Sequence, residues 1–169
     1  GGDRSGLRGR GGVTHADLVQ RAALWLAGTM RCGIVLTEFA SAEPETPDVL
    51  GFTRGGDSVL VECKTNRADF LRDRRKPSRA YDARGLGQRR YYFCEPGVIR
   101  FGTGERDLTD GWGLATVSAR VRVVVHPIPR PDGVRLVSEH RVLYSLGRRC
   151  VLGECWRPLD QRPAAGGEA

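Results

Sequence analysis

The stretch PDVLGFTRGGDSVLVECK, residues 47–64, predicts a β-hairpin whose second strand ends in two charged side chains. Its Gly-Gly turn lies between two short apolar runs, which favours an antiparallel pair. Side chains two residues apart on a strand share a face, so Glu62 and Lys64 project together while Cys63 points to the other face. Asp48 lies on the neighbouring strand. We therefore expect two carboxylates and one ammonium to meet at one edge of the sheet.

The residue types at this edge predict a site for a divalent cation. Two close carboxylates repel each other when no counter-ion is present. Mg²⁺ or Mn²⁺ relieves that repulsion because both ions prefer oxygen ligands. Such an ion would stabilise charge that develops on a scissile phosphate and would activate a water molecule. The pattern therefore points to phosphodiester chemistry.

The lysine at this edge is unusual for the chain. Lys64 is one of two lysines among 27 basic residues, the other being Lys76. An arginine does not lose its proton in proteins, whereas a desolvated lysine can. A lysine at this position therefore predicts a side chain that orients the attacking water or, as the neutral amine, deprotonates it, or that neutralises the phosphate as an ammonium.

The bipartite motif, PD followed after thirteen residues by ECK, resembles that of the PD-(D/E)XK nuclease superfamily. The flanking segments TEFASAEPETPDVLGF, VECKTNRADFLRDRRKP and GQRRYYFCEPGVI, followed by GWGL, are similar to a group of phage and bacterial proteins that includes the MmcB-like DNA-repair family. The resemblance covers about residues 14–116, and nothing beyond them adds to it.

The resemblance implies a restriction-endonuclease-like α/β fold, a divalent metal (Mg²⁺ or Mn²⁺) and a DNA substrate. By motif position, Asp48, Glu62 and Lys64 take the catalytic places. The backbone carbonyl of Cys63 takes the place that often completes the metal shell. Such sites often include a further acidic residue upstream, and Glu38, near the end of the first predicted strand, is our first choice for it.

Other polar residues near the motif have structural interpretations. Asp17 is expected to cap a helix, and Glu45 is a weaker choice than Glu38 for the upstream ligand. Gln88 corresponds loosely to a glutamine that follows the core in some relatives. We expect Asp69 and Asp73 to cap the second helix and to pair with Arg72 or Arg67. Three histidines, none spaced as a metal-binding pair, are expected to have structural roles: His15, His126 and His140.

Positive charge is concentrated directly after the motif. The chain has a net charge of +7 and a pI of about 9.6. Between residues 67 and 90, nine basic residues face three carboxylates, which leaves +6 in this segment. A concentration of this kind is typical of a surface that binds a polyanion. The predicted nucleic-acid-binding residues are Arg67, Arg72, Arg74, Arg75, Lys76, Arg79, Arg84, Arg89 and Arg90.

The predicted elements form one domain, residues 14–158, between two flexible tails, residues 1–13 (basic) and 159–169. Their order is that of a restriction-endonuclease-like core, α-β-β-β-α-β with a mixed sheet, followed by a C-terminal strand pair and a helix. We expect Pro77 to end the second helix, the following segment to be a mobile loop, and Gly147 to stop the last helix. The predicted ranges are 14–28 (helix), 33–39, 48–52 and 58–64 (strands), 66–76 (helix), 79–88 (loop), 89–94, 113–118 and 120–125 (strands) and 132–146 (helix).

Composition limits the cellular setting. The five cysteines are an odd number, and no secretion signal precedes them, so we expect reduced thiols in a cytoplasmic protein. No stretch approaches the roughly 18 apolar residues of a membrane span, so we expect no membrane partner. Many relatives act as dimers or within larger assemblies, so the expected partners are DNA and a second copy or a DNA-processing assembly.

The function that these patterns favour is a metal-dependent DNA nuclease of phage or bacterial DNA repair or processing, with endonuclease and exonuclease action both open. One alternative is a catalytically inactive nucleic-acid-binding module of the same fold. A second is an RNA-binding or scaffold protein that works through the basic block and the arginine-glycine tail. That alternative predicts binding that survives loss of Asp48 and Glu62 but fails without Arg72, Arg74 and Arg75. No aromatic RNA-recognition pattern supports it.

Overall fold

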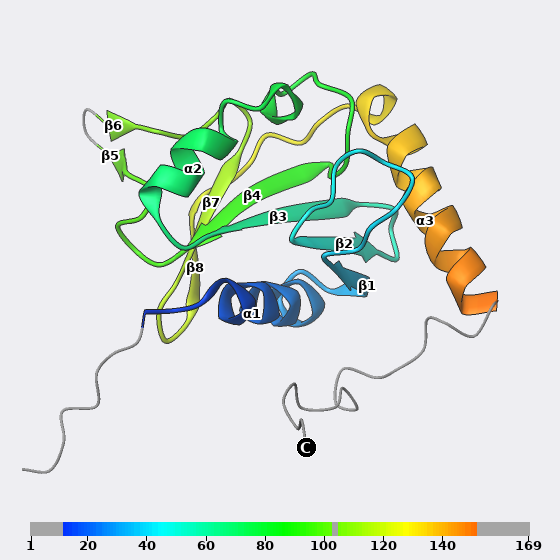
Figure 1. Ribbon diagram of the computed structural model, residues 1–169, viewed down its shortest axis with the longest axis horizontal. Coiled ribbons are helices and arrows are strands. Elements are labelled where there is room, and N and C mark those ends of the chain that lie inside the picture. Colours follow the sequence, from blue (N-terminus) through cyan, green and yellow to red (C-terminus); the bar gives the residue numbers. More distant parts are fainter. Residues whose placement is uncertain (1–11, 103–104, 152–169) are drawn as a thin grey trace, which may run out of the picture.

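The computed structural model describes residues 12–102 and 105–151, which fold into a six-stranded sheet with helices on both faces (Figure 1). The main elements are α1 (His15–Gly28), β1 (Cys32–Thr37), β2 (Val49–Thr53), β3 (Ser58–Lys64), α2 (Arg67–Asp73), β4 (Arg89–Cys94), β7 (Gly113–Val117), β8 (Val121–Val125) and α3 (Leu136–Val151). Short elements are the 3-10 turns Pro77–Arg79 and Asp132–Val134 and the strands β5 (Phe101–Gly102) and β6 (Glu105–Arg106).

The sheet is mixed, in the order β1-β2-β3-β4-β7-β8. The strands β1, β2 and β3 are antiparallel neighbours, whereas β4 is parallel to both β3 and β7, and β8 is antiparallel to β7. The predicted α/β class, with α-β-β-β-α-β followed by a strand pair and a helix, is confirmed. Within the described residues, no helix has the length and apolar character that a bilayer span requires.

Alternation along the strands divides the core into two layers. Val59, Val61 and Cys63 of β3 face α1, where Trp25 packs between aromatic side chains of β4. Leu60 faces the other side, where a second apolar cluster includes side chains of α2 and α3. A strand with period 2 necessarily sends Glu62 and Lys64 to this second face. The predicted hairpin therefore determines which face holds the charged side chains.

The first helix begins as its sequence predicts. The hydroxyl of Thr14 accepts a hydrogen bond from the N–H of Asp17, and the Asp17 carboxylate accepts one from the N–H of Thr14. This reciprocal capping box satisfies two N–H groups at the start of the helix. It also fixes the orientation of the first helical residue, His15, which lies above the end of β1.

Three predicted boundaries are wrong. The second helix ends at Asp73, and Pro77 begins a 3-10 turn, because proline is well suited to the first position of a helical turn. The last helix begins at Leu136, after a separate 3-10 turn, and continues through Gly147 to Val151. Gly147 is exposed within good helix formers, and one such glycine costs only about 1 kcal/mol relative to alanine.

The loop predicted to be mobile, residues 79–88, is held to the body of the domain. The guanidinium of Arg130 donates hydrogen bonds to the carbonyls of Tyr81, Ala83 and Leu86, and the Leu86 side chain is fully buried. These contacts stabilise one path for the backbone between α2 and β4. The predicted tails, by contrast, lie almost entirely outside the described residues.

Candidate cation and nucleic-acid site

The pairing register places three carboxylates in a row at one edge of the sheet. Val49 pairs with Val61 across β2 and β3, so Asp48, one residue earlier, lies opposite Glu62. Thr37 pairs with Val49 across β1 and β2. The N–H of Glu38 then donates to the carbonyl of Asp48 at 3.0 Å, which continues the pairing by one residue. The predicted residues Glu38, which follows β1, Asp48, which precedes β2, and Glu62, within β3, therefore meet at the same edge of the sheet.

Asp48 is held in place by backbone and side-chain partners. Its Oδ2 accepts a 2.6 Å hydrogen bond from the N–H of Cys63. Its Oδ1 lies 3.4 Å from Nε2 of His15. Burial raises the pKa of Asp48, while the Cys63 hydrogen bond and His15 act in the opposite direction. The carboxylate is thus partly desolvated and has one oxygen directed away from β3.

Glu62 is almost completely buried, with a side chain that is 6% exposed. Burial raises its pKa to about 7; Arg79 and Lys64 oppose the rise, and the nearby Asp48 charge adds to it. Its Oε2 lies 3.5 Å from Nζ of Lys64. Its Oε1 is buried and accepts no hydrogen bond from the described residues. Nη2 of Arg79 lies 3.2 Å from this oxygen and partly compensates its charge, and the lone pairs that accept no hydrogen bond could bind a cation.

Lys64 lies among three carboxylates and is as deeply buried as Glu62. Besides the Glu62 contact, its Nζ is 3.7 Å from Oδ2 of Asp69 and 3.5 Å from Oδ1 of Asp73, both on α2. As predicted, Asp69 also pairs with Arg72. Asp73 was expected to pair with Arg72 or Arg67, but its partners are Lys64, Lys76 and Arg79. Burial alone would raise the pKa of Asp73, but hydrogen bonds from Arg79 and Lys76 hold it well below its usual range.

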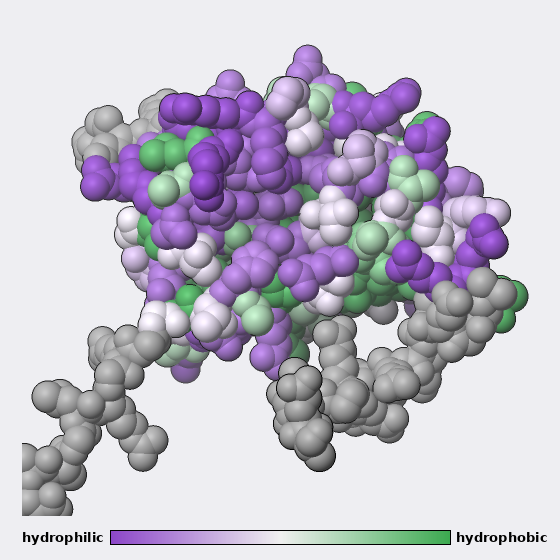
Figure 2. All heavy atoms as spheres, in the orientation of Figure 1, coloured by the Kyte–Doolittle hydropathy of each residue, from purple (hydrophilic) through white to green (hydrophobic). Residues whose placement is uncertain are grey.

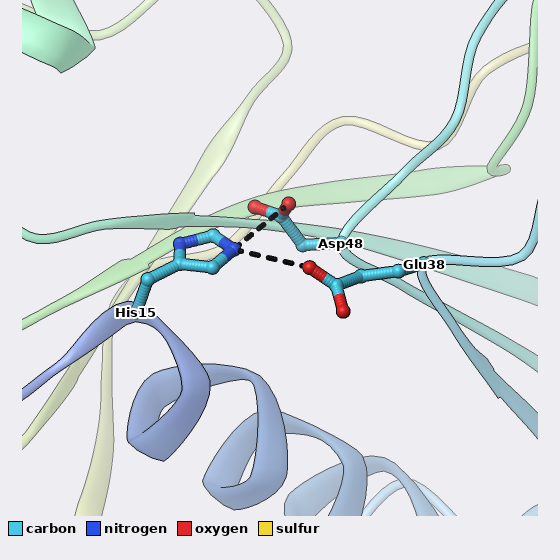
Figure 3. Close-up of side chains that lie close together, drawn as sticks. All are labelled: His15, Glu38 and Asp48. Carbon is cyan, nitrogen blue, oxygen red and sulfur yellow. Dashed lines mark ion pairs between the residues drawn. The ribbon is translucent and has the colours of Figure 1, made fainter.

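His15 joins the row of carboxylates, which the sequence did not predict. Figure 3 shows its imidazole directed toward Asp48 and Glu38, with Nε2 3.6 Å from Oε1 of Glu38. One ligand atom from each of these three residues lies within 4.8 Å of the others, a spacing that can hold a metal ion. The expectation of an ordinary structural role for His15 overlooked this arrangement. Its partners come from β1 and β2, so no local spacing could have indicated it.

The same region forms a cavity of about 480 Å³ between the sheet edge and α2. Figure 2 shows that hydrophilic residues gather over α2 and the adjoining surface. A larger hollow of about 660 Å³ lies between the sheet and α3, but apolar side chains dominate it. The cavity at the sheet edge is lined by His15, Thr46, Asp48, Glu62, Cys63, Lys64, Asp69, Arg72, Asp73, Lys76 and Arg79.

Two of the nine predicted nucleic-acid-binding residues are buried. The side chains of Arg79 and Arg90 are 4% and 2% exposed, and both pair with Glu45 inside the domain. They therefore present almost no surface to a phosphate backbone, although Arg79 lines the inner wall of the cavity. The structure leaves Arg72, Arg75, Lys76 and Arg84 exposed, with Arg67, Arg74 and Arg89 half-buried. Arg67 and Arg74 also pair with Asp107.

The weaker candidates lie outside the carboxylate row. Glu45 accepts hydrogen bonds from Arg79 and from the N–H of Leu86, and so belongs to the buried arginine network. Asp17 is engaged in the helix cap, as expected. The N–H of Gln88 donates to Ser58 at 2.7 Å, while its side-chain oxygen is buried without a partner in the described part of the chain.

Comparison with known proteins adds information about the fold. No family model matches this chain, and no curated protein matches it. A similar solved structure is that of SPO1766, a protein of unknown function from Silicibacter pomeroyi, with a TM-score of 0.56 and 20% sequence identity. The alignment covers 88% of this chain and 94% of the other. At this identity the likeness concerns the fold alone.

Proposed function

We propose that the protein is a divalent-cation-dependent DNA nuclease that hydrolyses phosphodiester bonds in phage or bacterial DNA processing or repair. The observation that carries the proposal is the convergence of Asp48, Glu62 and Lys64 on one cavity. Two carboxylates and an ammonium beside the exposed cations Arg72, Arg75 and Lys76 are the groups that cation-assisted phosphodiester hydrolysis requires.

The donor set fits Mg²⁺ or Mn²⁺. Asp48 and Glu62 offer carboxylate oxygens, and Oε1 of Glu62 accepts no hydrogen bond from the described residues, although Nη2 of Arg79 lies 3.2 Å away. The backbone carbonyl of Cys63 is a third oxygen by motif position. His15 and Glu38 are the nearest further donors to Asp48. When bound, the cation would stabilise charge on the phosphate and lower the pKa of a water molecule.

The protein's own residues would perform the remaining tasks. Lys64, paired with carboxylates on two sides, would neutralise a phosphate oxygen and orient the attacking water. The exposed side chains of Arg72, Arg75 and Lys76, on α2 and the residues directly after it, would bind phosphates on either side of the scissile bond. The cavity between α2 and the sheet edge would limit the water that reaches the site.

Cleavage of defined DNA tests the proposal. Purified protein is incubated with single-stranded, duplex, flap and junction DNA in Mg²⁺, Mn²⁺ or EDTA. We expect cleavage of at least one substrate with Mg²⁺ or Mn²⁺, none with EDTA, and loss of cleavage in Asp48→Asn. The matched control is Asp57→Asn, which removes a half-exposed carboxylate in the β2–β3 turn. Cleavage that persists in Asp48→Asn would be due to another enzyme or another site.

One observation favours an inactive nucleic-acid-binding module as the alternative. Lys64 already pairs with Glu62, Asp69 and Asp73, so its ammonium is engaged on several sides without a substrate. A binding module predicts that the protein binds DNA but cleaves no substrate in the panel, in Mg²⁺ or Mn²⁺ as in EDTA. The same experiment therefore separates the two functions.

A further inference from the structure

We infer that Arg79 is a positioning residue that holds Glu62 in the orientation the cation site requires. The inference rests on the proposed cation-dependent function and concerns the same site. Arg79 belongs to the basic segment that the sequence assigns to DNA binding, yet its side chain lies inside the domain, behind the carboxylate row. Its burial and its contacts require a different role.

Arg79 is fixed on every side of its guanidinium. Its Nε and Nη2 donate hydrogen bonds of 2.8 and 2.9 Å to the two oxygens of Asp73. Its Nη1 donates to Glu45. The guanidinium carbon lies 5.4 Å from the centre of the Trp112 ring, and the Trp112 indole N–H donates to the backbone carbonyl of Arg79 at 2.9 Å. A bidentate, stacked arginine of this kind has little freedom to turn.

The contact with Glu62 differs from these hydrogen bonds. Nη2 of Arg79 lies 3.2 Å from Oε1 of Glu62, close enough for a strong electrostatic attraction. Among the described residues, the same oxygen nevertheless accepts no hydrogen bond, while Nε, Nη1 and Nη2 of Arg79 each donate to Asp73 or Glu45. Arg79 therefore orients the carboxylate through its charge and leaves the oxygen lone pairs able to bind a cation.

Arg79 also connects Glu62 to Lys64. Oδ1 of Asp73, which Arg79 holds, lies 3.5 Å from Nζ of Lys64. One guanidinium thus fixes a candidate cation ligand and a partner of the candidate catalytic lysine. Its loss would free Glu62 and remove two of the hydrogen bonds that hold Asp73, without removing any atom proposed to touch the cation or the substrate.

Arg90 provides a matched control. It is buried to the same extent, and its guanidinium carbon also lies 5.4 Å from the Trp112 ring. Its hydrogen bonds, however, go to the carbonyls of Leu86 and Ser78, and its ion pair is with Glu45. Replacing Arg90 therefore removes a buried, stacked arginine without removing the contact at Glu62.

The test is Mn²⁺ affinity, measured by calorimetry, with the melting temperature in EDTA recorded for each variant. Arg79→Met should weaken Mn²⁺ binding at least about tenfold, the usual cost of losing a group that orients a ligand. Arg79→Lys, which keeps the charge but cannot form the fork, should weaken it about threefold, below that range. Arg90→Met and Arg90→Lys should bind as wild type despite similar losses in melting temperature.

Equal Mn²⁺ affinity in the Arg79 and Arg90 variants, or tighter binding in Arg79→Met, would overturn the inference and leave the proposed function intact. If Arg79→Met does not fold, the comparison of Arg79→Lys with Arg90→Lys decides the matter in the same way. The Glu62→Gln variant tests whether the cation site itself is correct. If that variant binds Mn²⁺ as tightly as wild type, the cation site itself is wrong, and both the proposed function and this inference fall.

Discussion

The Asp48 carboxylate accepts a 2.6 Å hydrogen bond from the backbone N–H of Cys63, the residue between Glu62 and Lys64. This bond joins the two halves of the motif and sets Asp48 against the end of β3. The backbone pairing of β2 with β3 ends at Val49 and Val61, so the N–H of Cys63, two residues further on, donates to the Asp48 side chain instead. The remaining Asp48 oxygen is directed toward His15, 3.4 Å away.

His15 should contribute to cation binding. We expect His15→Ala to weaken Mn²⁺ affinity about tenfold, because the imidazole lies beside both Asp48 and Glu38. The control is Gln20→Ala, an exposed position on the same helix. Calorimetric titration of both variants checks the expectation. Equal affinities would return His15 to a purely structural role.

Arginine should not replace the lysine at position 64. Its side chain is 7% exposed and enclosed by three carboxylates, so a larger guanidinium would displace its neighbours. We expect Lys64→Arg and Lys64→Ala each to lower the single-turnover cleavage rate at least ~10²-fold, the scale of a lost acid–base or electrostatic group. DNA binding, measured by titration, should change little. Near-normal cleavage by Lys64→Arg would mean that only charge matters there.

The exposed cations of α2 and the residues after it should supply much of the DNA affinity. Arg72→Gln together with Arg75→Gln should weaken binding and reduce the slope of log affinity against log salt concentration. Each lost phosphate contact contributes about 0.9 to that slope on duplex DNA. The matched control is the pair Arg120→Gln and Arg122→Gln, which are exposed near the β8 edge. An unchanged slope in the Arg72→Gln/Arg75→Gln variant would show that this surface does not contact DNA phosphates.

Cation affinity should depend on pH through Glu62. Its pKa of about 7 means that, below that pH, a cation must displace a proton from the carboxylate. Mn²⁺ affinity should therefore fall by up to about tenfold per pH unit below pH 7 and level off above it. The Glu62→Gln variant, whose binding should be weak throughout, is the control. A flat profile between pH 5.5 and 8 in wild type would contradict the raised pKa.

In the metal-free protein, the raised pKa of Glu62 should make the folding stability fall, not rise, as the pH increases. A carboxyl group whose folded pKa lies above its unfolded value of 4.5 stabilises the fold when protonated. That contribution is lost as the pH rises through about 7. In EDTA, Glu62 should therefore destabilise the wild type at pH 8 relative to pH 5.5, whereas added Mn²⁺ should restore stability most strongly at pH 8.

The local part of the site could be predicted from the sequence. The turn and the two-residue period of β3 determine that Glu62 and Lys64 share a face, and the antiparallel register then brings Asp48 opposite Glu62. The capping box at Thr14 and Asp17 is equally local. These features depend on neighbours within one hairpin or one helical turn.

The other part of the site depends on tertiary contacts. His15 reaches the carboxylates only because α1 packs across the sheet with its first turn above the end of β1. Arg79 and Arg90 are buried because Glu45 and Trp112, distant in sequence, meet them inside the fold. From composition alone we assigned both arginines to the surface, because arginine is rarely buried unless it is paired. Their burial can be recognised only when their partners in the fold are known.

The central claim is that Asp48 and Glu62 bind one divalent cation, and a crystal soaked in Mn²⁺ tests it most directly. Anomalous scattering locates the ion without reference to activity. We predict one peak in the cavity beside α2, roughly 2.0–2.6 Å from an oxygen of each carboxylate. A peak held by His15 and Glu38 without Glu62, or no peak in the cavity at saturating Mn²⁺, would contradict the claim.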